Sequence, residues 1–393
     1  MRVTHIITRL VIGGAQENTV ATVLGLLGKP GLKVDLISGP THGPEGSLEP
    51  SLGSHPELLI RVPSLVRPVH PWQDVRALLR LTSLLRRLGS DIVHTHSGKA
   101  GVLGRLAARR ARVPVIIHHI HGPSFGPFQG SAANTIFLAA ERYAAKMTTH
   151  FICSAQAMAR RYLAAGIGRP EMYTRVFSGF QMDPFLRAQN DPALRRKLGL
   201  APDAFVIGKI GRLAPLKGHE DLLLATSKLM RDEPRARLLF IGDGPLRPEL
   251  EAKARSLGLG DKVVFAGLVR PSEVAAYAGI MDCLAHLSYR EAVSRALPQA
   301  LAAGKPVVSY DFDGADEVCL HGDTGFLVRT GDTDSVASHL LELARNPDER
   351  RRLGQRGREL VEKEFRVEDM VTKIWDLYLS LSGNKFDSLA DKH

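Results

Sequence analysis

The sequence predicts an α/β protein with parallel sheets, built as two domains. Short apolar runs of strand length alternate with amphipathic runs of helical length along nearly the whole chain, which is typical of parallel sheets covered by helices. At 393 residues the chain is too long for one compact core. The alternation restarts in the second half. We therefore expect one domain at residues 1–184, a second at 185–365, and a final helix with a tail at 366–393.

A strand over residues 3–8 opens the first domain, and a helix follows it to about Leu27. Gly13 and Gly14 lie between these two elements. Glycines at a strand-to-helix turn allow backbone N–H groups to approach a phosphate at the helix N-terminus. The pair does not form a G-x-G-x-x-G pattern, so the sequence does not predict a Rossmann dinucleotide site.

A strand over 34–38, a loop rich in glycine and proline over 39–57, and a helix over 72–88 follow. The loop shows no pattern of regular structure. The helix has leucines at helical spacing and a basic face, which consists of Arg76, Arg80, Arg86 and Arg87. This face is either a solvated surface or a surface that lies on an anionic membrane.

Five histidines gather where two neighbouring strands of the first domain end: His94, His96, His118, His119 and His121. Ligands of open α/β sheets bind at the carboxyl ends of the strands. His96, and Lys99 at the start of the following helix, are therefore candidates for substrate contact. A metal site is an alternative, but no Asp or Glu accompanies the histidines at ligand spacing, so we do not predict one.

The first domain closes with a helix over 133–146, a strand over 150–153 and a helix from Ala155. The second domain then repeats the pattern of strand, loop and helix over 205–225. Arg212 and Lys217 lie five residues apart in this loop, which enters a helix N-terminus. Two cations beside helical N–H groups bind a diphosphate well, although exposed basic loop residues are the alternative.

Further along, Gly242 and Gly244 lie in a turn between a strand and a helix. The stretch 282–328 then gives a strand, a loop with Glu291, a short helix with Gln299, and another strand. A carboxylate and an amide eight residues apart suit a ligand covered with hydroxyl groups, unless both side chains simply face solvent. Gly314 and Glu317 lie at the head of the next predicted helix, and three late helices span about 334–345, 347–364 and 367–381.

The net charge of +11 lies entirely in the first half. Residues 1–184 contain 21 lysines and arginines against 10 aspartates and glutamates, and the remainder is balanced. A basic domain fits an anionic partner such as phospholipid, a lipid-linked pyrophosphate or nucleic acid, or it serves solubility alone. No nucleic-acid motif or aromatic stacking run is present, so we do not expect nucleic-acid binding.

Three cysteines, Cys153, Cys283 and Cys319, show no C-x-x-C spacing and fall in apolar segments. They predict reduced core residues of a cytoplasmic protein. No segment looks like a signal peptide, and no apolar run reaches the roughly 18 residues that span a bilayer. We expect a cytoplasmic protein that is peripheral at the inner membrane face if its basic half meets lipid.

The stretch 282–328 resembles the donor-site motif of glycosyltransferase family 4, the retaining sugar transferases with the GT-B fold. That motif is a glutamate, seven residues, a second glutamate and then Ala-Gly-Lys-Pro-Val-Val. Glu291 occupies the first position and residues 303–308 match the end, but Gln299 replaces the second glutamate. The amide keeps hydrogen-bonding capacity and loses the charge that would hold a ribose diol.

Three other segments resemble the same family. The run G-R-L-x-x-x-K-G at 211–218 is similar to its diphosphate motif, His121-Gly122 to its histidine loop, and Gly13-Gly14 to its glycine loop. The resemblance covers nearly the full chain and is strongest over 208–328. It implies two Rossmann-like domains that face a cleft, with the final helix crossing back to the first domain.

The resemblance also implies roles for these residues. Arg212 and Lys217 would hold the donor diphosphate, Glu291 would bond to hydroxyls of the donor sugar, and Gln299 would reach the ribose. The first domain would bind the acceptor through His96 and Lys99. The residues that complete the donor site would be Gly13, Gly14, His121, Gly242, Gly244, Gly314 and Glu317, with His121 supporting the reaction.

The implied activity is that of a retaining hexosyltransferase that needs no metal or other cofactor. It would move a sugar from a nucleotide-sugar, which we expect to be a UDP-sugar, to a hydroxyl of a sugar, lipid-linked or polysaccharide acceptor. One alternative is a GT-B sugar-nucleotide epimerase or hydrolase. Another is a nucleotide-sugar binding protein that has lost turnover, for which Gln299 is the one hint.

Overall fold

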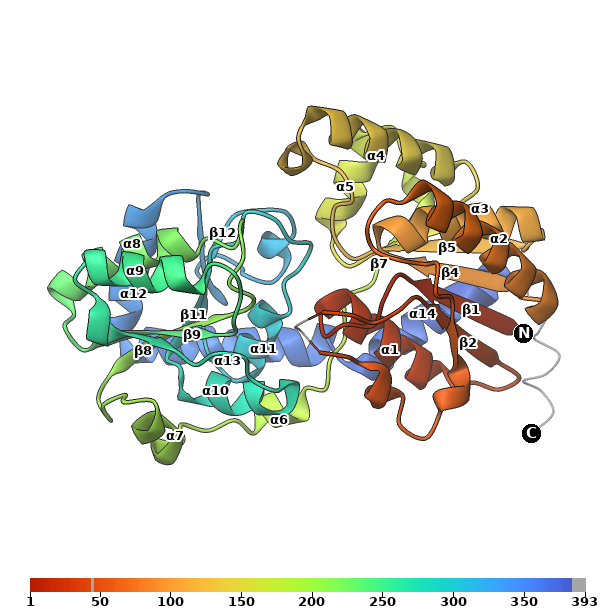
Figure 1. Cartoon of the computed structure of the whole chain (residues 1–393). Coiled ribbons are helices and arrows are strands. Elements are labelled where there is room, and N and C mark those ends of the chain that lie inside the picture. The colour runs from red at the N-terminus through yellow and green to blue at the C-terminus, as the bar shows by residue number, and fades with distance from the viewer. Residues whose placement is uncertain (44–45, 384–393) are drawn as a thin grey trace. The chain divides into compact units, whose positions relative to one another are not determined.

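The computed structural model describes residues 1–43 and 46–383 and divides the chain into two compact units, each with one parallel sheet (Figure 1). The first unit contains Met1–Phe180 and the chain from Val367 onward, and the second contains Gln181–Arg366. The sequence predicted the corresponding domain boundaries after residues 184 and 365. The predicted α/β class with parallel sheets is confirmed.

The sheet of the first unit has the strand order β3-β2-β1-β4-β5-β6-β7. Its strands are β1 (Arg2–Ile7), β2 (Lys33–Ser38), β3 (Leu59–Arg61), β4 (Ile92–His96), β5 (Val115–Ile120), β6 (His150–Cys153) and β7 (Tyr173–Arg175). The helices between them are α1 (Gly14–Leu26), α2 (Pro71–Leu88), α3 (Gly98–Ala111), α4 (Ser131–Ala145) and α5 (Gln156–Ala164). This order places β1 beside β4, so segments far apart in the sequence become neighbours.

Two edge strands, β3 and β7, were not predicted. Each has three residues, which is too short to show an alternation of apolar and polar positions. The loop 39–57 contains single 3-10 turns at Glu49–Leu52 and Pro56–Leu58, where no regular element was expected. Leu52 and Leu58 are buried there, so packing against the core, rather than a sequence pattern, orders these turns.

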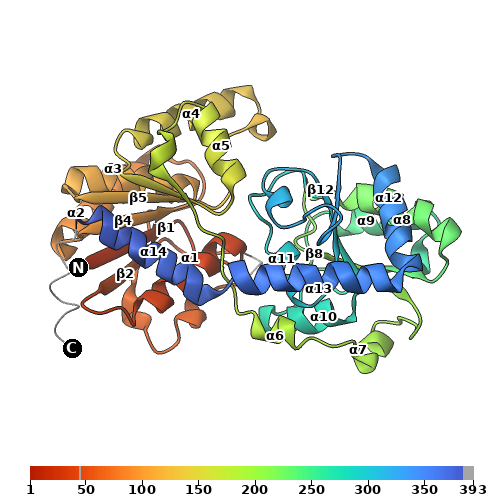
Figure 2. The same cartoon turned by 180° about the vertical axis from the view of Figure 1, so that it is seen from behind.

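The last helix, α14 (Val367–Leu381), completes the core of the first unit. It lies along α1 (Figure 2), and Val371 contacts the position of Gly25 so closely that a side chain there would collide with it. Asn18 donates a hydrogen bond to the Met370 sulfur at 3.0 Å. The buried residues of α14 are Met370, Val371, Ile374 and Tyr378. The apolar spacing of the predicted helix identified two of them, Met370 and Ile374.

The sheet of the second unit has the order β10-β9-β8-β11-β12-β13. Its strands are β8 (Phe205–Ile210), β9 (Ala236–Ile241), β10 (Val263–Phe265), β11 (Cys283–His286), β12 (Val307–Tyr310) and β13 (Gly325–Val328). Its helices are α6 (Asp183–Leu186), α7 (Pro192–Lys197), α8 (His219–Asp232), α9 (Arg247–Ser256), α10 (Val274–Ile280), α11 (Ala296–Ala302), α12 (Thr333–Arg345) and α13 (Pro347–Glu364).

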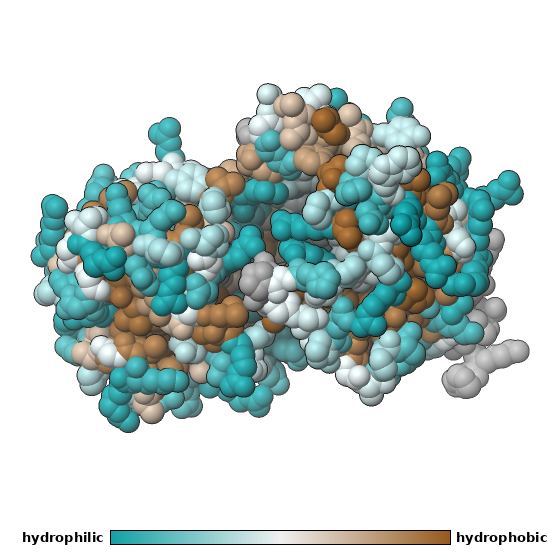
Figure 3. Space-filling model, in the orientation of Figure 1, coloured by the Kyte–Doolittle hydropathy of each residue, from teal (hydrophilic) through white to brown (hydrophobic). Residues whose placement is uncertain are grey.

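Apolar residues of this sheet are fully buried, among them Ile207, Leu238 and Leu284. Hydrophilic side chains cover most of the face shown in Figure 3. Because all strands are parallel, the loops that follow β8, β9, β11 and β12 emerge at the same edge of the sheet. The predicted donor residues of the second unit lie in these loops or just beyond them.

Candidate functional site

An ion pair between Lys217 and Glu291 joins the loop after β8 to the loop after β11. Both side chains are 28% exposed, so both remain accessible to a ligand. Hydrogen bonds hold the two loops together, since the Tyr289 N–H and the Ser288 hydroxyl donate to the Leu216 carbonyl at 2.9 and 3.2 Å. The structure therefore brings together two residues that the sequence assigned to different parts of the donor.

Arg212 belongs to the same loop, and its backbone is fixed from the helix that follows. His219, the first residue of α8, donates from Nε2 to the Arg212 carbonyl at 3.0 Å. Gly218 precedes that helix with φ +64°, and a Cβ there would lie 1.8 Å from the Leu287 carbonyl oxygen. The loop 211–218 is thus clamped between β11 and α8, with two cationic residues beside a helix N-terminus where anions bind well.

Gly242 and Gly244 form the turn after β9. Because they have no side chains, this turn can approach the backbone of the loop after β8 closely. A Cβ on Gly242 would lie 2.2 Å from the Gly211 carbonyl oxygen, and one on Gly244 would lie 2.3 Å from that of Leu213. The Leu213 N–H donates to the Asp243 carbonyl at 3.0 Å. These glycines therefore support the loop that carries Arg212.

Gln299 lies in the helix that follows β11, and Gly314 and Glu317 lie in the loop that follows β12. The Gly314 N–H donates to the Ala292 carbonyl at 3.1 Å, and Glu317 ends a 3-10 turn that starts at Ala315. A helix was expected here, and the structure has only this short turn. Gln299 lies in α11 and is partly exposed.

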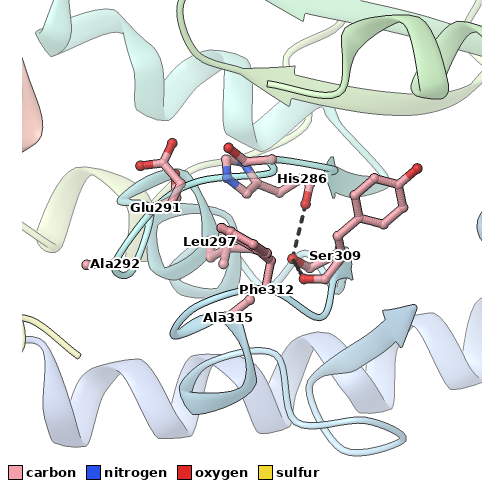
Figure 4. A pocket seen from close by; sticks show the side chains of 10 residues that line it. His286, Glu291, Ala292, Leu297, Ser309, Phe312 and Ala315 are labelled. Carbon is pink, nitrogen blue, oxygen red and sulfur yellow. Dashed lines mark hydrogen bonds between the residues drawn. The ribbon is translucent and has the colours of Figure 1, made fainter. Parts of the chain in front are cut away.

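A small recess adjoins Glu291 (Figure 4). In this view Glu291 and His286 lie at one side of it and Leu297 and Ser309 lie beneath. The Ser309 hydroxyl donates to the His286 carbonyl at 3.0 Å. The recess is lined by His286, Ser288, Glu291, Ala292, Ser294, Leu297, Ser309, Tyr310, Phe312 and Ala315. Hydroxyl, imidazole and carboxylate groups above an apolar floor suit a polar ligand such as a sugar.

Lys209 and His286 belong to this neighbourhood, and sequence reasoning missed both. Lys209 in β8 is 1% exposed, and its amine has no hydrogen-bond partner among the described residues. Burial, and then repulsion by Lys217, lower the pKa of Lys209 to about 7, whereas Glu291 partly offsets this. Burial, and then Lys209, hold the pKa of His286 well below its usual value. The one available signal was a lysine inside the apolar strand FVIGKI.

In the first unit, a cluster of five histidines lies on one face of the sheet: His5, His94, His96, His119 and His121. The register pairs His5 with His94 and His96 with His119 across β1, β4 and β5. Alternate residues of a strand face the same side, so the five rings gather there. The sequence identified four of them and missed His5. His118 faces the opposite side, where its ring is 3.0 Å from the Thr95 hydroxyl.

All five rings of this cluster are neutral. Burial holds the pKa of His5 and His121 at about 3 and that of His94, His96 and His119 well below the usual value. Within two groups, His5–His94–His96 and His96–His119–His121, one nitrogen per ring lies within 4.8 Å of the others. Neither group includes a carboxylate, and bonds between rings already use several of these nitrogens.

The remaining predicted residues lie at helix starts. Gly13 precedes α1 and Gly14 begins it, with Gly14 exposed, so the N–H groups of the first turn are open to an anion. Lys99, in the first turn of α3, pairs with Asp74 of α2 and donates to the Pro68 carbonyl. Those contacts tie α3 to α2, and the side chain is only 14% exposed.

Both halves of the chain match known families of glycosyl transferases. Residues 14–176 match the family Glycosyl transferase 4-like domain, and residues 190–360 match Glycosyl transferases group 1. The UDP-Gal:alpha-D-GlcNAc-diphosphoundecaprenol alpha-1,3-galactosyltransferase of Escherichia coli is 28% identical over 337 residues, which span 82% of this chain and 84% of that protein. A D-inositol 3-phosphate glycosyltransferase of Thermobispora bispora is 26% identical over 358 residues, spanning 85% and 82%.

Solved structures share the fold. Anabaena HepE in complex with UDP and glucose has a TM-score of 0.82 and 22% identity, covering 97% of this chain and 100% of that one. The predicted GT-B fold and the predicted family are thereby confirmed. The chain therefore belongs to glycosyltransferase family 4, and it is a hexosyltransferase-type enzyme that joins a glycosyl transferase 4-like domain to a glycosyl transferases group 1 domain.

Proposed function

We propose that this enzyme is a retaining glycosyltransferase that uses a UDP-sugar. The observation that carries the proposal is the placement of Lys217 beside Glu291 at the N-terminus of α8. One side chain can neutralise the donor diphosphate while the other bonds to hydroxyls of the attached sugar. Arg212, in the same loop, supplies the second cation. A bidentate guanidinium and a lysine together match the geometry and charge of a diphosphate.

The proposed reaction takes place on one face of the donor sugar. The bond between the anomeric carbon and the diphosphate oxygen breaks while the acceptor oxygen bonds to the same face of that carbon. The acceptor proton passes to an oxygen of the departing phosphate, so no protein nucleophile takes part. Cations and helix N–H groups that are already in place stabilise the negative charge as it develops on the leaving diphosphate.

We further propose that no metal ion takes part in this transfer. Arg212, Lys217 and the N-terminus of α8 supply the positive charge that a divalent cation supplies elsewhere. Activity in excess EDTA should equal activity in buffer alone. A loss of activity that magnesium or manganese restores would overturn this part of the proposal.

The donor base and the acceptor class are proposed from the relatives. The Escherichia coli relative is named for a UDP-galactose donor and a diphosphoundecaprenol-linked acceptor, and Anabaena HepE was crystallised with UDP and glucose. A staphylococcal relative, 23% identical, is named for capsular polysaccharide biosynthesis. We therefore propose a glycan or lipid-linked acceptor, bound by the first unit.

A surface on the first unit supports contact with an anionic membrane. Eight large hydrophobic residues are strongly exposed among the described residues, and half of them lie within one short segment. We call that segment the α2 face, and it consists of Arg67, Val69, Trp72, Val75, Arg76, Leu79, Arg80, Arg86 and Arg87. On the helix, positions 72, 75, 76, 79 and 80 share one side.

The charge of the α2 face matches such a partner. Asp74 is the one acidic residue between positions 67 and 88, and it pairs with Lys99. Exposed apolar side chains flanked by arginines bind where lipid headgroups meet acyl chains. Across residues 1–43 and 46–383, no helix has both the length and the apolar character needed to cross a bilayer.

The test of the transferase proposal is a transfer assay with UDP-, GDP- and ADP-sugars against polyprenyl diphosphate-linked acceptors. We expect release of one nucleoside diphosphate and a product with the anomeric configuration of the donor, read by NMR. A product of inverted configuration would refute the retaining mechanism. Tight nucleotide binding without turnover on any donor would favour the binding-protein alternative instead.

A further inference from the structure

A chain of hydrogen bonds links the final helix to His121. The Tyr378 hydroxyl of α14 is 2.6 Å from His94 Nδ1 and 3.4 Å from His5 Nε2. His5 Nδ1 is 2.9 Å from His96 Nε2, and His96 Nδ1 is 3.0 Å from His121 Nε2. Tyr378, His5, His94 and His96 are fully buried, so water does not compete for these bonds.

In this series of hydrogen bonds, the choice of donor in one bond determines the donor in every other bond. Each imidazole is neutral because burial lowers its pKa far below its usual value. A neutral ring carries one proton, so it donates through one nitrogen and accepts through the other. Fixing the donor in one bond therefore fixes the proton position on every ring from His5 to His121.

Tyr378 fixes that direction at the inner end. Its short contact with His94 Nδ1 has the length of a bond donated by an O–H group, and a phenol has only one proton to give. The oxygen then faces His5 Nε2 with its lone pairs, so His5 must donate from Nε2. It follows that His5 Nδ1 accepts from His96 Nε2, and His96 Nδ1 accepts from His121 Nε2.

We propose that Tyr378 is a positioning residue for His121, holding its proton on Nε2 so that its bare Nδ1 accepts a hydrogen bond from a hydroxyl of the bound sugar. His121 Nδ1 has no partner among the described residues. A buried polar atom without a partner destabilises the protein until a ligand satisfies it. A bare nitrogen attracts a hydroxyl and repels a phosphate or carboxylate oxygen, so this position is selective for sugar over diphosphate.

The role of the sugar rests on the proposed function, whereas the proton position does not. NMR of the ligand-free protein with 15N-labelled histidine reads the proton position from two-bond 15N–1H correlations. His121→Asn assigns the signal by removing it. We expect the Nε2-protonated pattern for His121 in the wild-type protein. An Nδ1-protonated pattern would overturn the inference.

Tyr378→Phe tests the positioning role. It keeps the ring and removes the hydroxyl, so the chain can run in either direction and His121 becomes a mixture of the two forms. Tyr162→Phe is the matched control, because Tyr162 is a buried tyrosine of the same unit whose hydroxyl contacts Ser124 at 2.7 Å. An unchanged His121 pattern in Tyr378→Phe would contradict the positioning role.

Titration with UDP-glucose separates this inference from the proposed function. A change of the His121 signal that accompanies binding supports sugar contact at Nδ1. Binding that leaves His121 unchanged overturns the contact but leaves the transferase proposal standing. If no sugar nucleotide binds, the proposed function fails, while the wild-type and Tyr378→Phe spectra still decide the proton position.

Discussion

Lys217 and Glu291 form an ion pair across two loops of the second unit, although 74 residues separate them in the sequence. Each is the internal partner of the other in the ligand-free protein. A donor diphosphate would compete with Glu291 for Lys217, and a donor sugar would compete with Lys217 for Glu291. In the proposed site, binding of the donor would therefore replace this pair with two contacts to the ligand.

Glu291→Gln should separate binding from turnover. The amide no longer holds Lys217, so the dissociation constant for UDP should stay the same or fall. The carboxylate contact to the sugar is lost, and turnover should fall by about 100-fold or more, equivalent to roughly 3 kcal/mol of lost transition-state stabilisation.

Calorimetry with UDP and a steady-state assay measure the two effects. Glu251→Gln is the control, since Glu251 pairs with Arg247 on the partly exposed surface of α9. A variant of Glu291 with weaker UDP binding and unchanged turnover would contradict the assigned roles.

Lys209→Met should stabilise the protein in a manner that depends on pH. The pKa of Lys209 is about 7 in the folded protein against 10.5 for an ordinary lysine. Between these values the unfolded chain binds the extra proton, so wild-type stability rises with pH by up to about 1.4 kcal/mol per unit. The loss of folding stability caused by the buried amine is greatest below pH 7 and disappears near pH 10.5.

The difference in urea midpoint between Lys209→Met and wild type should therefore shrink steadily from pH 7 to pH 9. Lys228→Met is a suitable comparison, because Lys228 forms a surface pair with Asp334. A difference between Lys209→Met and wild type that does not vary with pH would show that the amine does not titrate in this range.

Gly244→Ala should distort the loop 211–218, which carries Arg212. The new methyl group would lie 2.3 Å from the Leu213 carbonyl oxygen, and overpacking of this kind costs about 1–3 kcal/mol. We expect a melting temperature lowered by a few degrees and weaker UDP binding. Gly260→Ala places its methyl group in open space and should change neither. Equal behaviour of the two variants would contradict the supporting role of Gly244.

Trp72 offers a direct probe of the α2 face. The chain has two tryptophans, and Trp72 is 77% exposed. In a Trp375→Phe background its fluorescence should shift to shorter wavelength with vesicles of phosphatidylcholine and phosphatidylglycerol, because the indole enters the lipid interface. Vesicles of phosphatidylcholine alone should give a much smaller shift.

Charge reversal on the α2 face should abolish that shift. Arg76→Glu with Arg80→Glu removes the attraction to anionic lipid, whereas Arg196→Glu with Arg255→Glu makes the same change on the second unit. A shift that survives the first pair would exclude this face as the membrane surface. Pull-down of a protein partner without vesicle binding would assign it to a protein interface instead.

Much of this organisation was readable in the sequence. Apolar runs and helical spacing gave the parallel sheets and α14, and the run at 211–218 placed Arg212 and Lys217 at a helix start. These features depend on residues close together in the chain. The direct contact of Lys217 with Glu291 was not predicted, because it depends on how β8 and β11 pair.

Other features depend on three-dimensional neighbours alone. His5 joins the histidine cluster because β1 lies beside β4 in the sheet, an order that no local pattern gives. Lys209 and His286 are buried by packing around the carboxyl ends of β8 and β11. Tyr378 was not identified from the sequence, although its hydroxyl contacts His94 and His5.

The most direct test of the central claim is a thermal shift with UDP, GDP, ADP and their sugar conjugates. A ligand that binds the folded state raises its stability by mass action. We predict a clear shift for uridine nucleotides that is lost in Arg212→Ala and in Lys217→Ala. A shift that persists in both variants, or the absence of a shift with every nucleotide, would contradict the assignment of this loop as the diphosphate site.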